Sequence, residues 1–121
     1  MKKNKILFVE DEKVLRDTLQ ESLVANKFEV QIATNGEEAT ELINKNKYDL
    51  VLLDVILPKK NGFEVLSEMK DLNRTTPVIL LTNLSGSINV QKALDSGVHN
   101  YLVKSEYRLD EIIDRVRELI E

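Results

Sequence analysis

The chain has 121 residues, of which 42% are hydrophobic and 31% are charged, and its formal net charge is -4. These values are typical of a globular domain, and they exclude a disordered tail or a strongly basic nucleic-acid-binding segment. The absence of cysteine excludes disulfides and zinc–thiolate sites, and no apolar stretch approaches the length of a membrane span. We therefore expect one domain over residues 1–121, located in the cytoplasm, without direct contact with nucleic acid or membrane.

Strands and helices are predicted to alternate along the whole sequence. Short apolar runs predict the strands, and apolar residues three or four positions apart predict the helices. In chain order the predicted elements are strand 6–9, helix 12–26, strand 28–32, helix 36–46, strand 50–53, a helix that begins after Gly62, strand 78–81, helix 88–96 ending at Gly97, strand 101–103 and a helix over about 109–120. The residues at helical spacing in the first helix are Val14, Leu15, Leu19 and Leu23. The pair Lys59-Lys60 falls in a turn that is expected to be solvated.

The strands are predicted to form one parallel sheet with helices on both faces. Three of the strand runs are apolar throughout, as is typical of central strands, whereas 28–32 alternates apolar and polar residues like an edge strand. The strand order 2-1-3-4-5 satisfies this pattern. The predicted fold class is therefore α/β, a doubly wound, flavodoxin-like (βα)₅ sandwich of three layers.

Polar residues stand at the ends of four of these strands. Glu10 and Asp11 follow the first strand, Asp54 follows the third, Thr82 follows the fourth and Lys104 follows the fifth. Because the carboxyl ends of parallel strands meet at one edge of a sheet, these side chains should converge there. The predicted strand order also places the first and third strands side by side, so the three carboxylates become neighbours.

This set of groups suits a cation and a phosphoryl group. Three close carboxylates repel one another unless a cation lies between them, and Mg²⁺ prefers oxygen ligands while keeping positions open for water and phosphate. Lys104 supplies a positive charge and Thr82 a hydroxyl donor for phosphoryl oxygens. Asp54 ends a central strand and is the better candidate for a nucleophile that forms an aspartyl phosphate.

Taken together, these motifs resemble the receiver domain of two-component response regulators, over essentially the whole chain. The resemblance rests on four segments: Val9-Glu10-Asp11-Glu12, the run DVILPKKNG from Asp54 to Gly62, Thr82, and Tyr101-Leu102-Val103-Lys104. It implies that Asp54 accepts a phosphoryl group from a sensor histidine kinase and that Lys104 pairs with this group. Such a domain promotes only its own phosphorylation and dephosphorylation, so the resemblance implies a signalling protein and not an enzyme.

The resemblance also implies a magnesium site. Asp11, Asp54 and the backbone carbonyl of Ile56 would bind Mg²⁺ directly. Glu10 would act mainly through metal-bound water.

A conformational switch is implied as well. Thr82 would close onto the phosphoryl group while Tyr101 turns inward, which would repack the face formed by the fourth and fifth helices and the fifth strand. A downstream protein or an effector domain would bind this face, for which Val90, Ala93, Leu94 and Tyr101 are candidates. Phosphorylation-linked homodimerisation is a second use of the same face.

Three features depart from the usual pattern of the family. Ser105 follows Lys104 where a proline with a cis peptide bond is usual, and because a cis bond without proline costs about 2.5–4 kcal/mol, we expect a trans and differently shaped loop. Asn83 stands where a small residue is usual. Ile56 and Leu84 occupy the two positions that tune dephosphorylation, and since neither apolar side chain can hold an attacking water, we expect a long-lived aspartyl phosphate.

Two alternatives remain open on the sequence. A pseudo-receiver would keep the fold and signal without phosphate; the acidic residues count against it, whereas Asn83 and Ser105 leave it open. An aspartyl phosphatase of the haloacid dehalogenase type is disfavoured, because Ile56 stands where such enzymes carry a second aspartate. The sequence does not decide between a stand-alone regulator and a receiver that belongs to a longer protein.

Overall fold

The computed structural model describes residues 3–72, 75–83, 91–92, 95, 98 and 100–120. Its five parallel strands have the order β2-β1-β3-β4-β5, which confirms the predicted topology. The strands are β1 (Lys5–Val9), β2 (Glu29–Ala33), β3 (Leu50–Leu53), β4 (Val78–Thr82) and β5 (Asn100–Val103). The helices are α1 (Lys13–Ala25), α2 (Gly36–Lys45), α3 (Gly62–Asp71) and α5 (Leu109–Ile120), and a 3₁₀ turn, η1 (Lys104–Glu106), follows β5. Most of the helix predicted over 88–96 lies outside the described residues.

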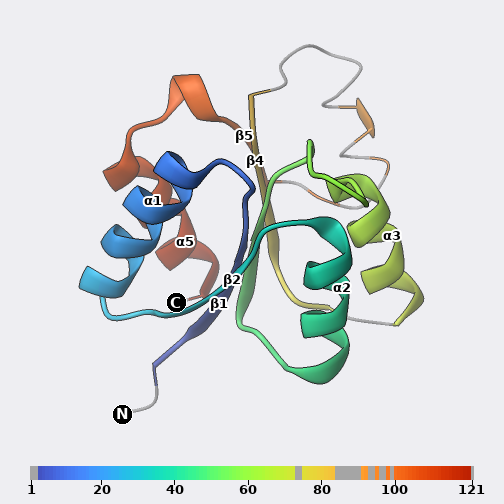
Figure 1. The fold of residues 1–121 in the computed structure, drawn as a ribbon. Coiled ribbons are helices and arrows are strands. Elements are labelled where there is room, and N and C mark those ends of the chain that lie inside the picture. The colour runs from blue at the N-terminus through green and yellow to red at the C-terminus, as the bar shows by residue number, and fades with distance from the viewer. Residues whose placement is uncertain are drawn as a thin grey trace.

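The sheet separates two hydrophobic cores, because successive residues of a strand point to opposite faces. Ile6 and Phe8 of β1 belong to the core beneath α1 and α5, whereas Leu7 and Val9 belong to the core beneath α2 and α3. Figure 1 shows these two pairs of helices on opposite sides of the sheet. Burial on both faces explains why the central strands are apolar throughout. In the part of the chain that the structure describes, no helix combines the length and the apolar character needed to cross a bilayer.

One of the four apolar residues noted at helical spacing in α1 lies on the surface. Val14 is 74% exposed, whereas Leu19 and Leu23 are completely buried. Leu15, Leu19 and Leu23 follow one another at intervals of four and share a face of the helix. Val14 instead lies one turn before the exposed Thr18, whose hydroxyl donates to the Val14 carbonyl. Helical spacing alone therefore does not separate exposed Val14 from the buried residues of α1, because the buried stripe of this helix is narrow.

The register of the sheet brings the strand ends to the same level. Val9 pairs with Leu53 of β3, and Thr82 of β4 pairs with Val103 of β5. The ladder continues past β3, since the Asp54 N–H donates to the Val9 carbonyl at 3.2 Å. The residues that follow β1 and β3 therefore begin side by side.

Two glycines allow the loops above the sheet to pack closely. A Cβ atom at Gly36 would lie 1.8 Å from the carbonyl oxygen of Lys60, and one at Gly62 would lie 2.4 Å from the carbonyl oxygen of Asp54. The Gly62 N–H also donates to the carbonyl of Val55 at 2.8 Å, which closes the loop between β3 and α3. Backbone atoms thus occupy the space that side chains at these positions would need.

We predict that Gly36→Ala destabilises the protein by about 2–3 kcal/mol, because the added methyl group meets backbone atoms of Lys60 and not a flexible side chain. Urea denaturation of the wild type and the variant measures the difference. Glu41→Ala, at an exposed position of the same helix, is the control and should change the free energy of unfolding by less than about 0.5 kcal/mol. Equal stability of Gly36→Ala and Glu41→Ala would contradict the prediction.

Candidate functional site

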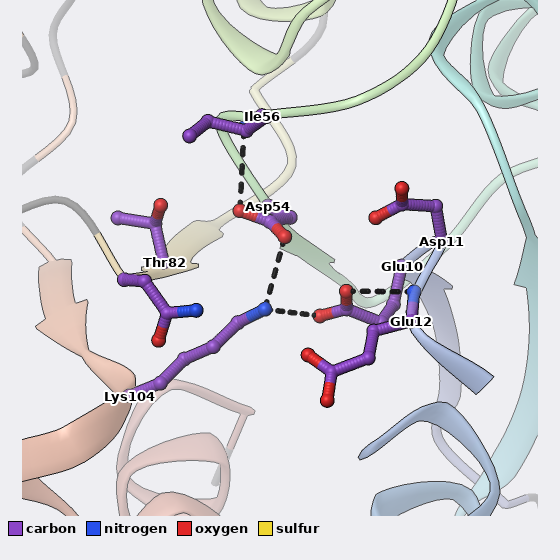
Figure 2. A pocket seen from close by; sticks show the side chains of 8 residues that line it. Glu10, Asp11, Glu12, Asp54, Ile56, Thr82 and Lys104 are labelled. Carbon is purple, nitrogen blue, oxygen red and sulfur yellow. Dashed lines mark hydrogen bonds and ion pairs between the residues drawn. The ribbon is translucent and has the colours of Figure 1, made fainter. Parts of the chain in front are cut away.

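The polar residues at the strand ends gather around one pocket of about 240 Å³. Figure 2 shows the side chains of Glu10, Asp54 and Lys104 meeting at its centre, with Asp11 and Thr82 on either side. The pocket is lined by Glu10, Asp11, Glu12, Asp54, Ile56, Thr82, Asn83 and Lys104. Every residue predicted to act in catalysis or in metal binding is therefore part of the lining, whereas Tyr101 is not.

Lys104 lies between two buried carboxylates. Its Nζ atom is 2.7 Å from Oε1 of Glu10 and 2.9 Å from Oδ2 of Asp54. All three side chains are at most 10% exposed, so water screens these ion pairs poorly. The lysine thus joins the residues that follow β1, β3 and β5.

Glu10 is the most buried acid of the pocket, with 1% of its surface exposed. Burial raises the pKa of Glu10; the ion pair with Lys104 opposes this effect, and the charge of Asp54 adds to it. One carboxylate oxygen, Oε2, accepts a hydrogen bond from the Glu12 N–H at 3.2 Å. Among the described residues, Oε1 accepts no well-formed hydrogen bond, and it relies on the charge of Lys104. A second cation would therefore favour the ionised form of Glu10.

For Glu10 the effect of burial on the pKa is larger than that of the neighbouring cation, whereas for Lys104 the neighbouring charges together have the larger effect. Burial alone would lower the pKa of Lys104, but its contacts with Glu10 and Asp54 outweigh burial and raise it. Lys104 is therefore a permanent positive charge in the pocket at neutral pH.

The three carboxylates can contribute oxygens to one ion. Glu10, Asp11 and Asp54 each have a carboxylate oxygen within 4.8 Å of those of the other two. Hard divalent cations such as Mg²⁺ take carboxylate, carbonyl and water oxygens as ligands. The donor set and the incompletely bonded Oε1 of Glu10 both fit such an ion. Exposed Asp11 stands at the open side of the cluster and buried Glu10 at its base.

Asp54 is held from two sides. The Ile56 N–H donates to Oδ1 at 3.3 Å, and Lys104 donates to Oδ2 at 2.9 Å. Thr82, at the end of the neighbouring β4, is completely buried and also lines the pocket. The Ile56 side chain is 57% exposed and stands at the rim. Asp54 is therefore a fixed, 6% exposed carboxylate with a cation and a hydroxyl beside it.

Tyr101 lies on β5, near the pocket but outside its lining. It is half-buried and packs against the core beneath α2 and α3. Burial raises the pKa of its phenol, and the negative charge of Asp54 raises it further. Tyr101 is thus close enough to the pocket for the charge of Asp54 to affect its phenol group. The other residues expected on the output face, Val90, Ala93 and Leu94, lie outside the described residues, as does Leu84.

Ser105 does not prevent Lys104 from reaching the pocket. The described residues contain no cis peptide bond, so the bond between Lys104 and Ser105 is trans, as expected. The chain turns here into the 3₁₀ turn η1, which the sequence did not predict. Lys104 still contacts both carboxylates, and Asn83 lines the pocket beside Thr82.

One further residue at the site, Arg16, was not predicted. Arg16 of α1 donates from Nη1 to the carbonyl oxygens of Glu10 and Asp11, both at 3.2 Å. It thereby supports the backbone that carries two of the acids. No spacing or motif in the sequence separates Arg16 from other surface arginines.

The fold and the pocket together define a receiver-like α/β domain, and comparisons with known proteins agree. The family model described as response regulator receiver domain matches residues 6–117. The chain belongs to this family.

Similar proteins include response regulators from several bacteria. The transcriptional regulatory protein DltR of Streptococcus agalactiae is 36% identical over 113 residues, which cover 93% of this chain and 50% of DltR. The transcriptional regulatory protein SrrA of Staphylococcus aureus is 36% identical over 117 residues, which cover 97% of this chain and 48% of SrrA. The chain thus spans about half the length of these curated relatives.

Solved structures show the same fold. The receiver domain of the Francisella response regulator 1452 has a TM-score of 0.91 and 33% identity, covering 97% of this chain and 96% of that one. The BeF3-activated N-terminal receiver domain of Klebsiella pneumoniae RstA has a TM-score of 0.90 and 30% identity, and the match covers 98% of this chain and 99% of the RstA domain.

We predict that Lys104→Met destabilises the metal-free protein at pH 8, by about 2–3 kcal/mol, because it leaves two buried carboxylates without their cation in a pocket that still admits water. The folded-state pKa of Lys104 is raised above its ordinary value of 10.5. Its stabilising contribution is therefore complete below about pH 10.5 and is lost as the pH rises through the folded-state pKa. The difference in the free energy of unfolding between wild type and Lys104→Met should therefore become smaller above about pH 10.5.

Urea denaturation between pH 8 and pH 11, with a chelator present, measures this difference. Lys13→Met is the matched control, since Lys13 forms an exposed ion pair with Asp17 and its loss should cost less than about 1 kcal/mol. If the loss of unfolding free energy in Lys104→Met stays constant across this pH range, the charge of Lys104 is not what stabilises the pocket and the prediction is wrong.

Proposed function

We propose that Asp54 is the phosphoacceptor of this receiver domain and that it takes its phosphoryl group from a phosphohistidine of a sensor histidine kinase. The observation that carries this proposal is the position of Lys104, whose ammonium bridges the buried carboxylates of Asp54 and Glu10. A structural aspartate would not require a buried cation and a buried hydroxyl, that of Thr82, beside it.

In the proposed reaction a carboxylate oxygen of Asp54 attacks phosphorus as the bond between phosphorus and the histidine nitrogen breaks. The products are an aspartyl phosphate and a free histidine on the kinase. Negative charge is spread over the phosphoryl oxygens during transfer, so positioning and charge neutralisation supply most of the catalysis. Lys104 contributes a fixed charge next to Asp54, and Thr82 a hydroxyl that can donate to a phosphoryl oxygen.

We further propose that the metal of this site is Mg²⁺. Asp11, Asp54 and the carbonyl of Ile56 would bind it directly, and Glu10 would bind its water. When bound, the ion would offset the repulsion between the carboxylates and an incoming phosphoryl group. The convergence of the three acids within 4.8 Å supports this ligand set.

The proposed output follows from the neighbourhood of β4 and β5. Thr82 would move toward the phosphoryl group, and half-buried Tyr101 would turn inward into the space released. The affected face includes β5 and α5, and a downstream protein, an effector domain or a second copy of this chain would bind there. The length of the curated relatives, about twice that of this chain, favours an effector domain as one such partner.

Residues 1–121 would constitute a single receiver domain in this proposal, and the protein would work in the cytoplasm beside the catalytic part of its kinase. It would act as a signalling switch and not as an enzyme with turnover. The pseudo-receiver alternative is not favoured, because the pocket keeps three carboxylates, Thr82 and Lys104.

Incubation with Mg²⁺ and acetyl phosphate should add one phosphoryl group to the wild type, which intact-mass measurement detects. Asp54→Asn should gain none, and a chelator should prevent the gain in the wild type, since the acids then lack their cation. Asp114→Asn, at an exposed position of α5, is the control and should be labelled like the wild type. Labelling of Asp54→Asn, or no labelling of the wild type while a known receiver is labelled, would overturn the proposal.

We also predict a long-lived phosphorylated state that Ile56→Asn shortens by about tenfold or more, because an amide at the rim can orient water toward the phosphorus. Mass measurement at intervals after removal of the donor follows the decay. Val14→Asn makes the same change at an exposed position outside the pocket and should leave the lifetime unaltered. Rapid decay in the wild type that Ile56→Asn does not accelerate would show that Ile56 has no such role.

A further inference from the structure

The loop between β3 and α3 turns back sharply just beyond the pocket. Lys59 has a φ of 70°, a left-handed conformation that residues other than glycine rarely adopt. The Lys60 N–H donates to the Pro58 carbonyl at 2.8 Å across Lys59. A three-residue turn of this kind, with a positive φ at its centre, is strained. Surrounding contacts must therefore hold the loop in place.

Three polar side chains outside the pocket hold the loop between β3 and α3 in place. Nζ of Lys60 lies 2.6 Å and 2.7 Å from the two carboxylate oxygens of Glu68 in α3. The hydroxyl of Thr40 in α2 donates to Oε2 of Glu68 at 2.7 Å and lies 3.4 Å from Nζ of Lys60. We call these three residues the Lys60 clamp. It joins the loop to α2 and α3, which lie side by side in Figure 1.

The clamp is better formed than an ordinary surface ion pair. The Lys60 side chain is 21% exposed and that of Glu68 is 39% exposed, and both oxygens of the carboxylate are engaged. Contact with Lys60, and then with Thr40, lowers the pKa of Glu68. Isolated, exposed pairs contribute little, whereas a three-membered network with this geometry restricts where Lys60 can lie.

The loop that the clamp restrains also forms one side of the pocket. The Ile56 N–H donates to Asp54, and Ile56 lies four residues before Lys60. At the clamped end, the Lys60 carbonyl packs against Gly36, and the Gly36 N–H donates to the Pro58 carbonyl at 3.3 Å. A shift of the turn would consequently be transmitted to the backbone of Ile56.

We infer that the Lys60 clamp is a positioning device, which sets the affinity of the pocket for Mg²⁺ although it touches none of the acids there. This inference rests on the proposed function, in particular on the Ile56 carbonyl as a metal ligand. Glu68, Lys60 and Thr40 are positioning residues, since they act on the metal only through the loop.

Titration of the metal-free protein with MgCl₂, followed by the amide chemical shifts of Ile56 and Gly62, tests the inference. Glu68→Gln keeps the size of the side chain and removes the charge that holds Lys60. We expect this variant to bind Mg²⁺ about tenfold more weakly than the wild type, at the lower end of the effect seen when a group bonded directly to a metal ligand is lost, because the clamp acts on Ile56 only through the loop. The exchange Lys60→Glu with Glu68→Lys restores the ion pair and should recover most of the affinity.

A control on the opposite face of the sheet separates positioning from general stability. Arg117 of α5 donates to Oδ1 of Asn26 at 2.7 Å, another polar link between two elements. Arg117→Ala should lower stability towards urea, yet bind Mg²⁺ like the wild type.

The outcomes distinguish the two proposals. If wild type and Glu68→Gln bind Mg²⁺ equally and both are phosphorylated, the clamp has no positioning role and the proposed function stands. If Arg117→Ala weakens binding as much as Glu68→Gln does, the effect is one of stability and the inference fails. If the wild type binds no Mg²⁺, both the proposed metal site and the inferred role of the Lys60 clamp are wrong.

Discussion

The contact on which the site depends is that between the ammonium of Lys104 and the two buried carboxylates of Glu10 and Asp54. Moving a carboxylate from water into a protein interior is costly unless a cation accompanies it. Lys104 meets that requirement for two acids that follow different strands. Its own strand, β5, lies two places from β3 in the sheet, so a long side chain is needed to reach them. The ion pairs thus join three strand ends and hold Asp54 inside a pocket that remains accessible to a ligand.

The sheet supplies the geometry for this contact, because its order decides which strand ends are neighbours. With β1 between β2 and β3, the acids after β1 stand beside Asp54, and β4 brings Thr82 next to them. Helices on both faces leave the carboxyl edge of the sheet as the place where a ligand can enter. The loops at this edge pack without side chains where Gly36 and Gly62 meet backbone atoms. The pocket is therefore a consequence of strand order combined with tightly packed loops.

The sequence was sufficient for the strand order and for the residues at the strand ends, since both follow from short-range patterns. Apolar runs mark strands that are buried on two faces, and the residue after each run falls at the carboxyl edge. The errors and omissions have a different origin. Val14 has the spacing of a core residue, but the width of the buried stripe depends on how α1 sits on the sheet. Lys60 was expected to be solvated and Arg16 received no role, because the partners of a long side chain depend on how loops and helices pack. Lys60 meets Glu68 of α3 and Thr40 of α2, and Arg16 reaches the backbone carbonyls of Glu10 and Asp11.

Charge explains why this pocket suits a divalent ion. The pocket lining contains four acidic side chains, those of Glu10, Asp11, Glu12 and Asp54, and one basic side chain, that of Lys104. This excess of acidic groups favours a cation of high charge, and an incoming phosphoryl group adds more negative charge. In the proposed function, phosphorylation of Asp54 would draw two donors of the pocket lining, Lys104 and the hydroxyl of Thr82, toward the new oxygens. Thr82 ends β4 and pairs with Val103, which lies in the same strand as Tyr101. A movement of Thr82 in the proposed switch would therefore act directly on β5, the strand whose Tyr101 already responds to the charge of Asp54.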